Sequence, residues 1–102
     1  MYQSTINFNN QEEQLLLETL YNSVLNVEQE DQSNRPDQSN KYWALGQLSV
    51  IVPLIFHRHD LERGDLFDSL DDPDTPPMFK AADRLLLHAL ELLEDNDVNT
   101  MG

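Results

Sequence analysis

Apolar residues recur at three- and four-residue steps along three long stretches of the chain. This spacing places them on one face of an α-helix, and it predicts helices at 11–28, 40–59 and 76–95. A shorter helix is predicted at 61–70, where the leucines and the phenylalanine are spaced to anchor one side. Three long helices and one short, acidic helix predict an all-α fold, a small helical bundle.

The residues next to these stretches are typical of helix ends. Asn10 precedes the first helix and Glu13 follows three residues later, an arrangement like a capping box. Thr75 stands before the last helix, and Pro76 is expected at its first position, where the missing N–H is not needed. These signals set the predicted starts of both helices.

The stretch 40–59 is apolar on almost every side, which predicts a helix that is buried on almost every side. Tyr42 and Trp43 are accordingly expected in the core, with one of them partly exposed near the linker. Pro53 lies inside the stretch and removes one backbone hydrogen bond, so the central helix is expected to be kinked at Pro53 rather than broken. The weaker alternative is a buried strand at 50–56, with Pro53 at a sheet edge.

The helices are expected to form one domain at 11–95, because 102 residues form one core more readily than two. Residues 1–10 are expected to form an N-terminal arm, extended or paired as a strand. Residues 96–102 lose the helical spacing and are predicted to be a flexible tail. Residues 29–39 offer no large apolar side chain to bury, so they are predicted to be a polar linker inside the domain.

The charge and the amino-acid composition of the chain argue against several classes of function. The chain has 6 Lys and Arg against 19 Asp and Glu, a formal charge of −13, and no cysteine. Direct nucleic-acid binding through a basic footprint, disulfides and cysteine-based zinc sites are therefore not expected. The N-terminus has no signal-peptide pattern, and the longest apolar stretch is short and interrupted. These features predict a cytoplasmic protein without membrane contact.

His57 and His59, followed by Asp60, have the residue types of a metal or acid–base site. Two residues apart on a helix, the histidines point about 200° away from each other and do not converge on one ion. They are better explained, with Arg58, as positive groups at the C-terminal end of the second helix. His88 falls among charged residues on the solvated face of the last helix.

No motif in the chain predicts catalysis. There is no glycine-rich phosphate loop and no nucleophile at a recognisable turn. The sequence therefore predicts no catalytic residue, no metal site and no cofactor, and a protein that is not an enzyme.

Two candidate surfaces remain. Residues off the main apolar stripes, Leu15 among them, are expected to form a second apolar surface, which favours a homo-oligomer and most simply a homodimer. A compact monomer covered by the arm and the short helix is the alternative. The expected apolar interface comprises Trp43, Leu54, Leu87 and Leu90. The second surface, the acidic stripe, comprises Glu62, Asp65, Asp68, Asp71 and Asp72.

These surfaces lead to two function hypotheses. The first is a small acidic interaction or regulatory protein that docks a protein partner through its apolar helices. The second is a nucleic-acid-mimicking inhibitor of the phage type, whose acidic stripe occupies the basic groove of a DNA- or RNA-binding protein. The spacing of the stripe, about 4.5–6 Å per charge on a helix, is comparable to that of phosphates along a strand.

Overall fold

The computed structural model describes residues 6–33 and 39–96. It contains the helices α1 (Gln11–Ser33), α2 (Ser39–Arg58), α3 (Arg63–Asp71) and α4 (Pro77–Asp95), with no strand in the described part. The predicted all-α bundle is confirmed. Residues 6–10 of the expected arm form no strand; residues 1–5, 34–38 and 97–102 lie outside the described residues.

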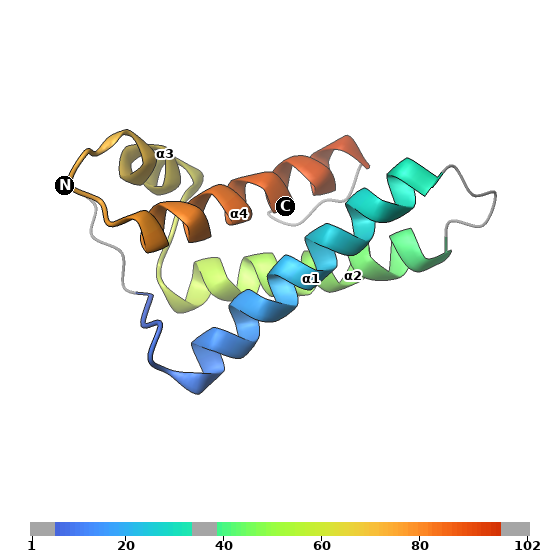
Figure 1. The fold of residues 1–102 in the computed structure, drawn as a ribbon, viewed down its shortest axis with the longest axis horizontal. Helices are drawn as coiled ribbons and strands as arrows, with labels where there is room; N and C mark the ends of the chain where they lie inside the picture. The colour runs from blue at the N-terminus through green and yellow to red at the C-terminus, as the bar shows by residue number, and fades with distance from the viewer. Residues whose placement is uncertain (1–5, 34–38, 97–102) are drawn as a thin grey trace.

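α1 and α2 form an antiparallel hairpin, and α4 packs against both of them (Figure 1). α3 lies at one end of the molecule and packs on α4 alone among the described helices. The core forms where the three long helices meet. Its fully buried side chains include Leu20, Val27, Leu45, Leu48, Val52, Ile55, Leu86 and Leu93.

The first helix begins as predicted and ends later. The Asn10 side chain accepts hydrogen bonds from the amides of Glu12 and Glu13 at 2.9 and 3.2 Å, which confirms the N-cap. The predicted end at residue 28 is wrong, because α1 continues to Ser33 through half of the expected linker. The extension consists largely of Glu and Gln, good helix formers, and Asp31 within it forms an ion pair with Lys41 of α2.

α2 runs unbroken through Pro53, as expected, but the expectation that it is buried on almost every side is wrong. Among the described helices, α1 and α4 pack on it and α3 does not, so the side of α2 that faces away from α1 and α4 is not covered by a described helix. Tyr42 and Trp43 are about two-thirds exposed rather than in the core, and Val50 is equally exposed.

The boundaries of α3 and α4 also differ from the predictions. α4 starts at Pro77, one residue late, because Pro76 precedes a proline and holds an extended ψ of 148°. α3 starts two residues late, because Leu61 is buried and ends the preceding turn instead. Phe67 does not anchor α3 but is half exposed, whereas Leu66 is fully buried.

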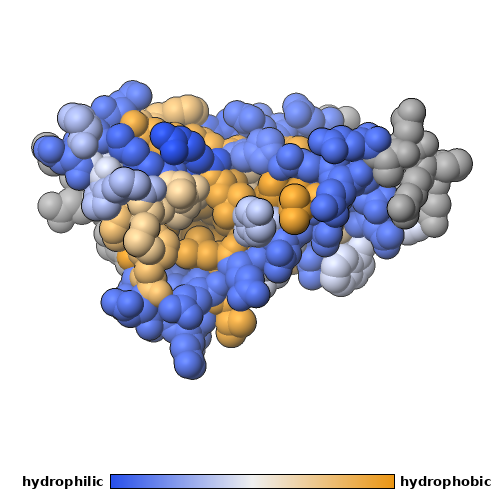
Figure 2. All heavy atoms as spheres, in the orientation of Figure 1, coloured by the Kyte–Doolittle hydropathy of each residue, from blue (hydrophilic) through white to orange (hydrophobic). Residues whose placement is uncertain are grey.

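The molecular surface is mostly hydrophilic, but apolar side chains are exposed in places. On the face drawn in Figure 2, apolar side chains are visible in a hollow between α1 and α4, surrounded by hydrophilic residues. The arm borders this end of the bundle, where the rings of Phe8 and Phe79 meet edge to face with centroids 4.9 Å apart. In the described part, no helix combines the length and hydrophobicity needed to cross a membrane.

Candidate interaction surfaces

The end of α2 is shaped by a Schellman turn. Asp60 adopts a left-handed φ of 52°, and the amide of Leu61 donates to the carbonyl of Phe56 at 2.8 Å. The amide of Asp60 donates to the carbonyl of His57 in the same turn. The histidines are therefore not needed to cap the last carbonyls, and the turn directs His59 toward the start of α1.

A buried ionic cluster joins this turn to α1. The carboxylate of Glu13 lies 2.7 Å from His59 Nε2 and 3.3 Å from Arg58 Nε, and the Glu13 and His59 side chains are almost completely buried. Arg58 also contacts Glu12 at 3.2 Å. Glu13 thus holds the open end of the hairpin together rather than completing the predicted capping box.

Replacing Glu13 with glutamine is expected to lower the free energy of unfolding by about 1–3 kcal/mol, because it removes the charged acceptor beside the buried His59 and one of the two carboxylates that Arg58 contacts. Urea denaturation measures the loss. Glu12→Gln is the matched control, since Glu12 is largely exposed, and it is expected to cost under about 1 kcal/mol. Equal losses in the two variants would contradict a special role for Glu13.

The exposed apolar residues of the hairpin form one candidate surface. Trp43, Val50 and Leu54 on α2 recur on one helix face, and Leu15 on α1 lines the same groove as Leu54; all four are 46–66% exposed. We call these four residues the hairpin surface. Between Trp43 and Val50 the chain has Gly46, and the surface there forms a hollow of about 630 Å³.

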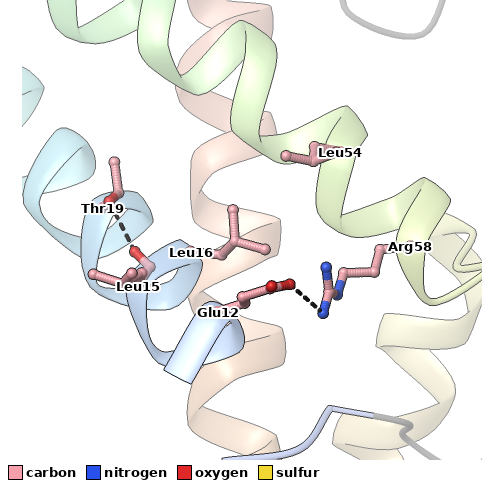
Figure 3. Close-up of a pocket in the computed structure, with 6 residues that line it drawn as sticks. All are labelled: Glu12, Leu15, Leu16, Thr19, Leu54 and Arg58. Atoms are coloured by element: carbon pink, nitrogen blue, oxygen red, sulfur yellow. Dashed lines mark hydrogen bonds and ion pairs between the residues drawn. The ribbon is translucent and has the colours of Figure 1, made fainter. Parts of the chain in front are cut away.

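A groove of about 350 Å³ continues this surface between α1 and α2. In Figure 3, Leu16 and Leu54 point into the space between the two helices from opposite sides. The ion pair between Glu12 and Arg58 closes one end of the groove. The groove is therefore apolar along its length and charged at its end, a form typical of binding grooves.

The structure does not bring all the expected interface residues together. Trp43 and Leu54 are exposed on α2, but Leu87 is half-buried on α4. The prediction that Leu90 lies at the surface is wrong. Leu90 is 3% exposed, because it shares the buried face of α4 with Leu86 and Leu93. Val50 was missed as a surface residue, and only the positions of α1 and α4 reveal its exposure.

The acidic stripe lies on and beside α3. Glu62, Asp68 and Asp71 are exposed, and three members of the stripe are engaged with the backbone: Glu62 and Asp65 form the capping box of α3, and Asp72 is the third. Asp65 accepts a hydrogen bond from the Glu62 amide at 2.9 Å, and Asp72 accepts one from the Asp74 amide at 2.9 Å. Arg63, the basic residue of this segment, forms an ion pair with Glu94 of α4. Arg63 is thus engaged with α4 rather than with the exposed carboxylates of the stripe.

Asp83 is a second buried carboxyl that the sequence did not predict, after Glu13. Asp83 on α4 is fully buried, and burial raises the pKa of its carboxyl above the ordinary value. The Ser69 hydroxyl of α3 lies close by and opposes part of this shift, but it is not aligned for a regular hydrogen bond. The position of Asp83 within the apolar stripe, between Ala82 and Leu86, was the available signal.

The histidines do not converge on one site. His57 is exposed, His59 contacts Glu13, and His88 contacts Glu28 of α1 at 2.8 Å rather than pairing only along its own helix. Over residues 6–33 and 39–96, no group of three or more His, Asp or Glu side chains is arranged to hold a metal ion.

No family model matches the chain, and neither a curated protein nor a solved structure matches it significantly. The surfaces themselves are therefore the basis for inferring function.

Proposed function

We propose that the protein is a non-enzymatic, cytoplasmic interaction protein that docks a protein partner through the hairpin surface. The observation that carries this proposal is the exposure of large apolar side chains side by side on α1 and α2. The hydrophobic core does not include these side chains, so packing inside the chain does not explain why apolar residues occupy these positions. Contiguous exposed apolar residues on a soluble protein are typical of interaction sites.

The composition of the hairpin surface supports the proposal. Trp43 and Val50 border the hollow over Gly46, and Leu15 and Leu54 line an apolar groove that has an ion pair at its end. Binding energy at protein interfaces is concentrated in such anchors, tryptophan above all, surrounded by polar residues that exclude water. Trp43 therefore has the character of an anchor residue.

A second candidate function is supported by the exposed carboxylates of α3. Glu62, Asp68 and Asp71 face solvent, and the nearby Arg63 is already paired with Glu94. This arrangement suits a nucleic-acid mimic that occupies the basic groove of a DNA- or RNA-binding protein.

Affinity capture over a salt series, with mass spectrometry of the retained proteins, separates the two functions. Docking through the hairpin surface predicts a partner that is retained when NaCl rises from about 0.1 to about 0.5 M. Trp43→Ala combined with Leu54→Ala is expected to reduce its capture at least about tenfold. A retained partner that is indifferent to these substitutions would contradict the proposal.

Mimicry predicts the opposite pattern. Capture then falls by about tenfold or more over the same salt range, because ionic contacts are screened. It is also lost when Asp68 and Asp71 are both changed to lysine. These two positions are the matched choice because they are exposed, whereas Asp65 and Asp72 support the local backbone.

A further inference from the structure

α2 differs from the other helices in charge. It contains no Asp or Glu, although the whole chain has a formal charge of −13. Its lysine and arginine are paired with carboxylates of α1: Lys41 with Asp31, and Arg58 with Glu12 and Glu13. Two copies of this chain repel each other where their carboxylates meet, so the exposed face of α2 is the face on which they can approach.

The exposed face of α2 also has an open notch at its centre. Trp43, Gly46, Val50 and Leu54 follow one another on this face over about 16 Å of helix. A Cβ added at Gly46 would meet no atom within 4 Å, so packing inside the chain does not require glycine there. Glycine within a helix costs stability relative to alanine, whereas it allows another backbone or side chain to approach closely.

We propose that the hairpin surface takes a second copy of this chain, with the two α2 helices antiparallel across a two-fold axis. The spacing along α2 is self-complementary. With the axis midway between Gly46 and Val50, each Val50 faces the notch at Gly46 of the second copy. Each Trp43 then lies opposite Pro53, one residue before Leu54 and the adjoining groove, and every contact is made twice, as in an isologous dimer.

The sizes of the side chains and of the hollows that they face in the second copy suit this pairing. Trp43 is the largest exposed side chain of α2, and the groove beside Leu54 has a volume of about 350 Å³ and is lined by Leu15 and Leu16. The smaller Val50 faces the hollow over Gly46. A basic partner, by contrast, is drawn to the carboxylates of the other helices rather than to α2. This inference rests on the proposed function, since it names the occupant of the same surface.

Sedimentation equilibrium of the full chain tests the pairing, at concentrations from about 1 to about 500 µM. The expected result is a monomer–dimer equilibrium that tightens as NaCl rises from about 0.05 to about 0.5 M, because salt screens the repulsion. Trp43 is the only tryptophan. Its fluorescence emission is expected to move to shorter wavelength over the same concentrations at which the mass doubles.

Either of two results overturns the inference. One is a monomeric mass over the whole range of concentration and salt. The other is dimer formation without a change in Trp43 emission, which places the interface elsewhere. A monomeric chain that still captures a salt-resistant protein overturns this inference but leaves the proposed function standing. A dimeric chain that captures no other protein supports this inference and removes the proposed partner.

Three variants locate the interface. Val50→Glu is expected to weaken dimerisation at least about tenfold, since it places two carboxylates near the axis. Phe67→Glu is the matched control: it adds the same charge at a half-exposed position on α3, which does not contact α2, and is expected to change dimerisation less than about twofold. Gly46→Leu fills the notch and is expected to prevent pairing while circular dichroism shows a folded chain. Equal effects of Val50→Glu and Phe67→Glu would overturn the inference.

Discussion

Replacing Leu48 with alanine is expected to lower the free energy of unfolding by about 3–5 kcal/mol. Leu48 is fully buried on the side of α2 that faces the core, so its truncation leaves a cavity. Small domains have a total stability of about 5–15 kcal/mol, so this loss is a large fraction of it. Urea denaturation at low chain concentration, where self-association is negligible, measures the change.

Val50→Ala is the matched control for Leu48→Ala. Val50 lies two residues further along α2, on the side that none of the described helices covers, and it is 66% exposed. The expected change in the free energy of unfolding is within about 0.5 kcal/mol. Similar losses of stability at the two positions would contradict the described placement of α2. They would indicate instead a helix that is buried on every side, as its composition suggested.

Because of Asp83, the free energy of unfolding of the wild-type chain is expected to contain a contribution that decreases from acid to neutral pH. Replacing Asp83 with asparagine is expected to abolish this pH-dependent contribution. Burial raises the pKa of the folded-state carboxyl above 3.8, so the folded state binds the proton more tightly than the unfolded state. This contribution to stability is fully present below pH 3.8 and is lost as the pH rises through the raised pKa.

The difference in unfolding free energy between Asp83→Asn and the wild type isolates this contribution from the many other carboxyls. It is expected to shift in favour of the variant between about pH 4 and pH 7. At pH 7, Asp83→Ala is expected to stabilise the chain by about 1–3 kcal/mol, because it removes a buried, poorly paired polar group. A difference that does not change with pH, or a variant destabilised at pH 7, would contradict this view of the carboxyl.

Local signals predicted the helices well, because each helix carries its own periodicity and end residues. Asn10 caps α1 through its own side chain, so the start of α1 follows from residues adjacent in sequence. The end of α1 could not be predicted in this way. Its last residues include no apolar side chain, and the ion pair between Asp31 and Lys41 joins them to α2.

The surfaces were less predictable because exposure depends on which neighbours a helix acquires. The composition of α2 does not reveal that only α1 and α4 pack on it, and so it does not distinguish Trp43 from Leu48. Leu90 was predicted at the surface but is buried, because the face of α4 that contains it packs against the other helices. The ionic cluster at Glu13 required the turn at Asp60, which brings His59 to the start of α1 from 46 residues away.

The order of packing along the chain has a consequence for folding speed. The most extensive helix contacts join α1 to α2 and α3 to α4, which are consecutive in sequence. Closing short loops costs little entropy, and chains dominated by such local pairs fold in microseconds to milliseconds. We therefore expect fast folding, with the contacts of α4 with α1 and α2 as the least local ones to form.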